Sequence, residues 1–264
     1  MHIEMIDALP IGKDGKALGA VQAVVRWDAD GTVAELAKTI EEKQLSSLSF
    51  VDAEFFSNKE RGIELCFQMR TMGINVLWSA VITADVSREL FREMRLSGCQ
   101  RLDMRLAPDN AERGLAHARE FGFDVSICNV DGTPYASDRI TYDVSEREAV
   151  AERLPGLHSV QFDLAVAYFK ARRFSEVMLP LGKAMTLRFP MNELCLNLLA
   201  CLSAAKHYPT MAAGLLDQAG YGWPHPVVLR NRTLLKSWLE SGGDVKGVRL
   251  MLDPEGAGAS LAYT

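Results

Sequence analysis

The sequence lacks the features that mark membrane, secreted and nucleotide-binding proteins. No apolar run comes near the ~20 residues that span a bilayer, and the first residues, MHIEMIDALPIGKDGK, contain no apolar signal core. Gly12, Gly15 and Gly19 match neither the phosphate-loop spacing nor the dinucleotide-binding spacing. A net charge of −5 argues against broad binding to nucleic-acid phosphates. We therefore expect a cytoplasmic protein that binds neither membranes nor nucleic acid.

Patterns of metal ligands are missing as well. The histidines show no paired ligand spacing, and the scattered cysteines predict reduced, mostly buried thiols. These residues are His2, His117, His158, His207 and His225, and Cys66, Cys99, Cys128, Cys195 and Cys201. Hydrophobic residues make up 48% of the 264 residues and charged residues 24%, which predicts a packed core in one large or two modest domains.

The first half of the chain alternates short β-rich runs with amphipathic runs. The predicted strands are Val21–Trp27, Leu48–Val51, Ile74–Val81, Arg101–Leu106 and Phe123–Val130. The predicted helices between them are Val33–Gln44, Lys59–Met72, Val86–Leu96 and Ala111–Phe121. Strands recur at intervals of roughly 25 residues, which leaves room for one crossover helix each time. Residues 1–150 are therefore predicted to form an α/β domain with a parallel sheet, and Arg139–Val144 could be one more extended segment.

The second half is predicted to be helical. Its expected helices are Leu157–Arg172, Ser175–Arg188, Asn192–Lys206, Pro209–Ala219, Pro226–Glu240 and Val245–Leu252. A shift of 34 residues aligns similar residue types, for example Leu164 with Leu198 and Arg172 with Lys206. Residues 151–253 thus resemble a short tetratricopeptide array, with a plain helical bundle that caps the first domain as the alternative. Residues 254–264 are expected to be a flexible tail.

Three blocks in the first half resemble a known enzyme superfamily. They read SFVDAEFFSNKER (Ser49–Arg61), GCQRLDMRL (Gly98–Leu106) and GFDVSICNVDGTP (Gly122–Pro134). In this order they are similar to the radical S-adenosylmethionine enzymes, and the likeness covers roughly Val25 to Pro134. The resemblance implies a partial (β/α) barrel of parallel strands.

The chain departs from that family where the family's chemistry lies. No three cysteines have the Cys-x3-Cys-x2-Cys spacing that holds the family's iron–sulfur cluster. Ala53 stands where the family's block has a second Asp, and Ala107 where it has the Glu that usually helps to hold S-adenosylmethionine. We therefore expect neither an iron–sulfur cluster nor S-adenosylmethionine as a cofactor.

The candidate site residues follow from the barrel, because function lies at the carboxyl ends of barrel strands. In and after the predicted strands come Asp52, Glu54, Trp78, Ser79, Asp103, Arg105, Asn129 and Asp131. Asp52 and Glu54 are two residues apart, so both can face one side, and with Asp103 they could form a hard-metal site or an acid–base pair. The alternatives are solvated or ion-paired carboxylates, and an internal Asp103–Arg105 salt bridge.

Three functions follow, in order of preference. The first is a non-catalytic scaffold or binding protein that holds a small molecule or peptide at the barrel mouth and docks a partner protein or peptide through its helical domain. The second is an enzyme of different chemistry, with Asp52, Glu54, Asp103 and Arg105 as its working groups. The third is a purely structural interaction protein with a filled barrel.

Overall fold

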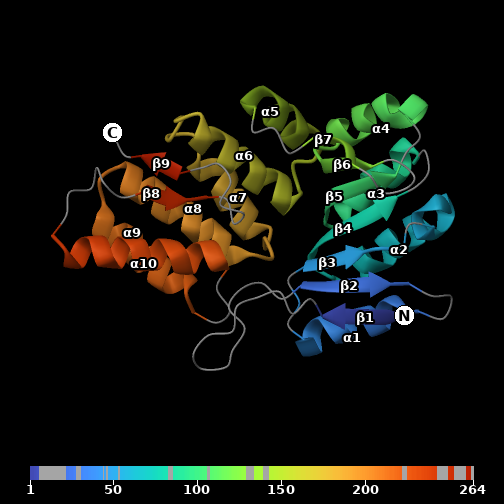
Figure 1. Cartoon of the computed structure of the whole chain (residues 1–264), viewed down its shortest axis with the longest axis horizontal. Coiled ribbons are helices and arrows are strands. Elements are labelled where there is room, and N and C mark those ends of the chain that lie inside the picture. The colour runs from blue at the N-terminus through green and yellow to red at the C-terminus, as the bar shows by residue number, and fades with distance from the viewer. Residues whose placement is uncertain are drawn as a thin grey trace. The chain divides into compact units, whose positions relative to one another are not determined.

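The chain is an α/β protein with a mostly parallel sheet and a separate helical region (Figure 1). The computed structural model describes residues 1–5, 22–27, 31–43, 45, 47–52, 54–82, 86–105, 108–128, 134–138, 143–221, 225–242, 249–252 and 260–262. These residues divide into two compact units, with the boundary between Val160 and Gln161. The sequence places the domain boundary near residue 150.

The first unit contains a seven-stranded sheet whose strands follow one another in chain order. The strands are β1 (His2–Met5), β2 (Gln22–Arg26), β3 (Ser47–Phe50), β4 (Leu77–Ile82), β5 (Cys99–Arg105), β6 (Asp124–Cys128) and β7 (Pro134–Asp138). Strands β2 to β6 are parallel, while β1 and β7 pair antiparallel at the two edges. The parallel strands confirm the sequence prediction, whereas the edge strands β1 and β7 were not predicted.

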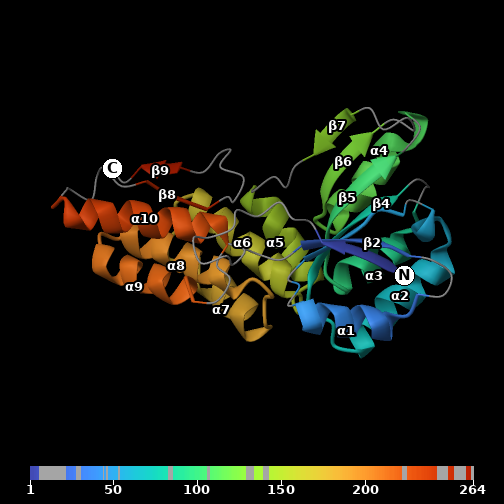
Figure 2. The same cartoon turned by 60° about the horizontal axis from the view of Figure 1, so that its bottom comes forward.

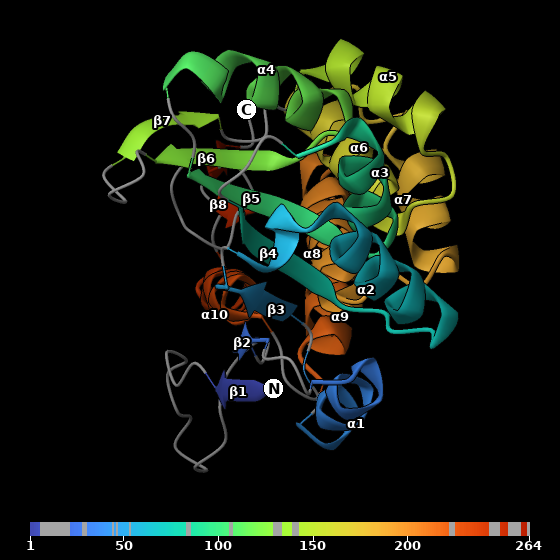
Figure 3. The same ribbon diagram turned by 90° about the vertical axis from the view of Figure 1, so that its right-hand side faces the viewer.

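Helices α1 to α4 connect the parallel strands and lie on the same side of the sheet (Figure 3). Their bounds are α1 (Val33–Lys43), α2 (Lys59–Thr71), α3 (Arg88–Leu96) and α4 (Pro108–Glu120). Asn58 caps α2 by accepting a hydrogen bond from the Arg61 amide at 2.9 Å, and Gly73 ends that helix in the left-handed region at φ 67°. A further helix, α5 (Val144–Arg153), follows β7. The predicted extended segment Arg139–Val144 is therefore wrong at Val144, and residues 139–142 lie outside the described part.

An aromatic cluster fills the space between the sheet and α2. Phe50 makes an edge contact with Trp78, with the ring centroids 5.2 Å apart, and Phe56 stacks on Trp78 at 5.8 Å. Trp27 and Phe55 extend the cluster. Because all five rings are buried, the aromatic residues of the SFVDAEFF run belong to the core of this unit.

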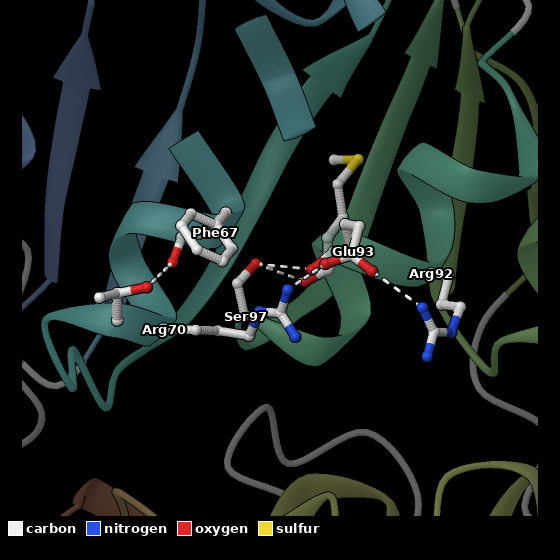
Figure 4. A network of polar contacts seen from close by, with 7 residues as sticks. Phe67, Arg70, Arg92, Glu93 and Ser97 are labelled. Atoms are coloured by element: carbon white, nitrogen blue, oxygen red, sulfur yellow. Dashed lines mark hydrogen bonds and ion pairs between the residues drawn. The ribbon is translucent and has the colours of Figure 1, made fainter. Parts of the chain in front are cut away.

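A buried carboxylate joins the helices that cover the sheet. Glu93 of α3 forms ion pairs with Arg70 of α2 and with Arg92, the latter at 3.0 Å (Figure 4). The Ser97 hydroxyl donates to the backbone carbonyl of Glu93 at 3.0 Å. Because a buried charge is costly without partners, the Arg70–Glu93 pair links α2 to α3, and Arg92 on α3 itself gives the carboxylate a second partner.

Two buried arginines hold the turn that follows α4. Arg95 of α3 is completely buried and donates from Nε to the carbonyl of Phe121 at 3.1 Å. Arg147 of α5 donates from Nη1 to the carbonyl of Gly122 at 3.4 Å. Cations beside the last carbonyl groups of a helix complement its dipole, so these contacts fix the end of α4 and the entry to β6.

The second unit is mostly helical and repeats a helical element. It contains most of α6 (His158–Lys170), then α7 (Met178–Thr186), α8 (Asn192–Ala205), α9 (Pro209–Ala219) and α10 (Pro226–Glu240). Helices α6, α8 and α10 begin at intervals of 34 residues. The residue that ends each of them in the left-handed region recurs too, namely Arg172, His207 and Gly242 at φ 59°, 63° and 65°. Figure 2 shows α8, α9 and α10 side by side.

The carboxyl-terminal part of the second unit differs from the prediction. The predicted helix Val245–Leu252 is wrong at Arg249–Met251, which form strand β8. Three residues of the expected flexible tail, Ser260–Ala262, form strand β9 and pair with β8 antiparallel. The helical prediction failed because the apolar run VRLML suits a strand as well as a helix.

Candidate ligand-binding face of the sheet

In β3, β5 and β6, buried apolar residues alternate with polar residues that are partly or fully exposed, apart from the irregular start of β5. In β4 only Ser79 is partly exposed, and Leu77 and Val81 on the same face are buried. In β3, Leu48 and Phe50 are buried, whereas Ser47 and Ser49 are partly exposed. Parallel strands that helices cover on both faces have nearly continuous apolar sequences and do not alternate in this way. Among the described elements of this unit, the helices that cover the sheet lie on the apolar face (Figure 3). The opposite face is therefore the polar one.

Strand register places the polar residues of that face in a row. Ser49 of β3 pairs with Ser79 of β4, Ser79 with Arg101 of β5, and Arg101 with Asp124 of β6. The hydroxyl oxygens of Ser49 and Ser79 are 2.8 Å apart, which is hydrogen-bond distance. We call Ser49, Ser79, Arg101 and Asp124 the polar row. It crosses four neighbouring parallel strands.

A β-bulge in β5 produces this arrangement. Trp78 pairs with Cys99, but the next residue, Ser79, pairs with Arg101, so Gln100 is the extra residue. Without the bulge, Arg101 would face the helices and Leu102 would face the polar side, because strand side chains alternate. The bulge turns the guanidinium to the polar face and returns Leu102 to the core, where it is fully buried.

Asp103 lies two residues after Arg101 in β5 and therefore on the same face of the sheet as the polar row. It pairs in register with Val81 and Ser126, and Arg101 donates from Nε to its Oδ1 at 3.3 Å. The side chains of Arg101 and Asp103 remain 48% and 36% exposed, so the ion pair is open to solvent. The predicted Asp103–Arg105 bridge is replaced by this Arg101–Asp103 pair, while Arg105 lies exposed at the end of β5.

The structure moves Trp78 and Ser79 away from the strand end. Both were predicted to follow their strand, but they are the second and third residues of β4. Trp78 is buried on the helix side and donates from Nε1 to the Ser97 carbonyl at 2.9 Å. Ser79 lies on the polar face, in the middle of the polar row.

Asp52 and Glu54 follow the carboxyl end of β3, but they are not part of a strand. The strand ends at Phe50, the Asp52 carbonyl accepts the Phe55 amide at 3.2 Å, and Glu54 has helical backbone angles. The alternation that would bring both carboxylates to one side therefore does not apply. Asn129 and Asp131 lie outside the described residues.

Among the side chains that the structure describes there is neither a metal centre nor a reactive thiol. Within the described ranges, no three His, Cys, Asp or Glu side chains come together as metal ligands, and this includes Asp52, Glu54 and Asp103. The thiols of Cys66, Cys99, Cys195 and Cys201 are buried. Burial raises the pKa of Cys66, Cys195 and Cys201 to about 12 and that of Cys99 well above its usual value. These thiols stay protonated near neutral pH, and a protonated thiol neither attacks nor ligates.

The described polar face presents several kinds of polar group to a ligand. It presents hydroxyl groups that donate and accept, one guanidinium and two carboxylates within two neighbouring rows. The guanidinium suits a carboxylate, and the carboxylates suit an ammonium group. No base is seen in contact with either serine hydroxyl among the described residues, so an activated serine nucleophile is not formed there.

Sequence reasoning named Ser79 and Asp103 as site residues at strand ends, and it missed Ser49, Arg101, Asp124 and Ser126. The signal was present, because SLSF, RLDMR and DVSIC alternate polar and apolar residues within predicted parallel strands. Such alternation in a parallel sheet indicates a face that helices do not cover.

Comparisons with known proteins give no assignment for this chain. No family model, no curated protein and no solved structure matches it. None of the described helices has the length and apolar character that crossing a membrane requires.

Proposed function

We propose that this chain is a non-catalytic binding protein derived from a radical S-adenosylmethionine enzyme. Its sheet is a partial (β/α) barrel, and the polar face of the sheet binds a small molecule. Its helical unit is a short tetratricopeptide-like array that docks a peptide or a partner protein.

The strand order supports the partial barrel. Strands β2 to β6 follow one another without reversal, and α1 to α4 lie on one side. A doubly wound sheet reverses its strand order and carries helices on both faces, whereas a (β/α) barrel does neither. In such a barrel the inward residues of every strand alternate with outward ones, and the polar row lies on the side of the sheet opposite the helices, which would be the interior.

The polar row is the observation that carries the binding proposal. A side chain that filled a closed barrel would be apolar, but Ser79, Arg101 and Asp103 keep polar groups on this face. Arg101 and Asp103 present opposite charges side by side. They fit a zwitterion such as an amino acid or the end of a peptide, which would bind the guanidinium through its carboxylate and Asp103 through its ammonium group.

Ligand-dependent thermal stability tests this proposal. Free L-amino acids and dipeptides are the probes, and a ligand that binds only the folded state raises Tm by mass action. We expect at least one probe to raise Tm of the wild-type chain and the rise to vanish in Arg101→Ala. Lys38→Ala, an exposed change on α1, should keep the rise. If no probe shifts Tm, or if the shift survives Arg101→Ala, the polar row is not the ligand site.

Acid–base catalysis is the second candidate, and Asp103 is the residue that favours it. Its carboxylate is partly exposed and lies beside a guanidinium, which resembles an oriented catalytic group. Mass spectrometry of any stabilising probe after incubation separates the two functions. Conversion that Asp103→Asn abolishes would show an enzyme, and an unchanged probe supports binding alone.

A further inference from the structure

Two buried asparagines occupy matching positions in successive repeats of the second unit. Asn197 of α8 and Asn231 of α10 are 34 residues apart, and Asn231 donates from Nδ2 to Asn197 Oδ1 at 2.8 Å. Asn197 is 1% exposed and Asn231 is fully buried. Asp163 holds the corresponding position in α6 and is also buried. Helices α6, α8 and α10 thus each carry a buried polar residue at the same repeat position. Burying an apolar residue there would cost less desolvation free energy.

The two asparagines bind the backbone of one residue of β8. Asn231 Oδ1 accepts the Met251 amide at 2.8 Å, and its Nδ2 donates to the Met251 carbonyl at 2.7 Å. Asn197 Nδ2 donates to the same carbonyl at 2.9 Å. A side-chain amide that satisfies both backbone groups of a residue acts as a neighbouring strand would. These hydrogen bonds recognise an extended backbone and do not depend on which side chain the residue carries.

The contacted segment is short and has an apolar anchor. Strand β8 contains three residues, and within the described part of the chain it is paired only with β9, also of three residues. A two-stranded pair of this size is marginal by itself, so its place depends on the helices. Leu250 is fully buried and supplies the anchor.

We propose that the face of α8 and α10 that carries Asn197 and Asn231 is a binding site for an extended peptide, and that Arg249–Met251 occupies it in cis. The ligand is an extended segment of a partner protein. It has a Leu-like side chain, and the next residue has a backbone N–H group, so that residue is not proline. It binds by replacing β8. This inference rests on the peptide-docking part of the proposed function and is independent of the polar row, whose test uses a different unit.

A labelled peptide with the sequence VRLMLD, from Val248–Asp253, tests the site in trans. The full chain with Met251→Pro lacks the amide that Asn231 accepts, so its own strand no longer competes. Fluorescence anisotropy should show the peptide binding this variant at least about tenfold more tightly than the wild type, in which the tethered strand has a high effective concentration. Adding Asn231→Ala should weaken that binding by about tenfold or more.

Asn192→Ala is the matched control, since Asn192 is an exposed asparagine at the start of α8, the helix that carries Asn197. It should leave peptide binding to the Met251→Pro chain unchanged. No binding to a folded Met251→Pro chain, or binding that Asn231→Ala does not change, overturns the proposal. A dimer in light scattering would also overturn it, because the occupant would then be a second copy.

Hydrogen exchange on the unaltered chain gives a result even if Met251→Pro does not fold. An excess of the unlabelled peptide should accelerate exchange of the Met251 amide as β8 leaves the site. Polar-row binding of amino acids should persist in all these variants if only the peptide proposal fails. An unchanged exchange rate at saturating peptide overturns the proposal.

Discussion

Asn231 donates a hydrogen bond to Asn197 across a separation of 34 residues, and both amides hold the backbone of Met251. One chemical group thus recurs at the repeat spacing and binds a strand that lies outside the helices.

The first prediction concerns this pair. Asn231→Ala removes three described hydrogen bonds and leaves the Met251 amide without its acceptor. We expect a loss of about 2–3 kcal/mol in the free energy of unfolding, because buried polar groups without partners are costly. Urea denaturation measures it. Asn192→Ala, on the exposed start of α8, should stay within about 0.5 kcal/mol, and an equal loss in both variants would contradict the buried contact.

The second prediction uses the left-handed residues that end α6 and α8. Arg172 and His207 adopt φ 59° and 63°, which cost a residue with a Cβ atom free energy that glycine avoids. His207→Gly should therefore stabilise the protein by up to about 1 kcal/mol, seen as a higher Tm in calorimetry. Gly242→Ala, at the matching position of α10, should lower Tm. A lower Tm for His207→Gly, or a higher Tm for Gly242→Ala, would show that these residues do not adopt left-handed backbone angles at the helix ends.

The third prediction compares two glycines that follow helices in the first unit. A Cβ atom on Gly98, at φ 104°, would stand 2.4 Å from the Val76 carbonyl oxygen. Gly73, at φ 67°, has open space around the same position. Gly98→Ala should cost about 3 kcal/mol or more and Gly73→Ala only about 1 kcal/mol. Equal losses in urea denaturation would mean that the turn before β5 can relax.

The fourth prediction is a pH dependence that His158 produces. Burial, and then the positive charge of Arg95, lower the pKa of His158 from 6.5 to about 4. The unfolded chain therefore takes up a proton between these values while the folded chain does not. The contribution of neutral His158 to the free energy of unfolding is therefore complete above pH 6.5, and it is lost as the pH falls toward about 4.

Urea midpoints of the wild type and of His158→Gln, measured across this range, check the effect. The wild type should lose more stability on acidification than the variant, because glutamine takes up no proton. Parallel losses in the two proteins would show that other groups govern the response.

Much of the first unit could be predicted because it depends on local patterns. The four predicted helices and five parallel strands appear within a few residues of their expected bounds, since amphipathic period and glycine caps act locally. Gly73 ends α2 as expected. Strand β1 has no such signal, because its four residues become a strand by pairing with β2.

The polar face was predicted only in part because it depends on register. The sequence named Ser79 and Asp103 by their place near strand ends, and no local pattern shows that a bulge turns Arg101 toward Asp103. Trp78 was assigned to a strand end although the predicted strand Ile74–Val81 extends beyond it, and the structure places it inside β4. Strand β8 depends on amides that lie 20 and 54 residues away in sequence, which no local pattern reveals.

Reconstitution with iron and sulfide tests the central proposal, binding without radical chemistry, most directly. The four thiols with described side chains are buried and have raised pKa values, and no cysteine triplet has the cluster spacing. We predict that the desalted protein shows no charge-transfer absorbance near roughly 400 nm. A stable band there, with iron and sulfide retained in equal amounts, would contradict the proposed function.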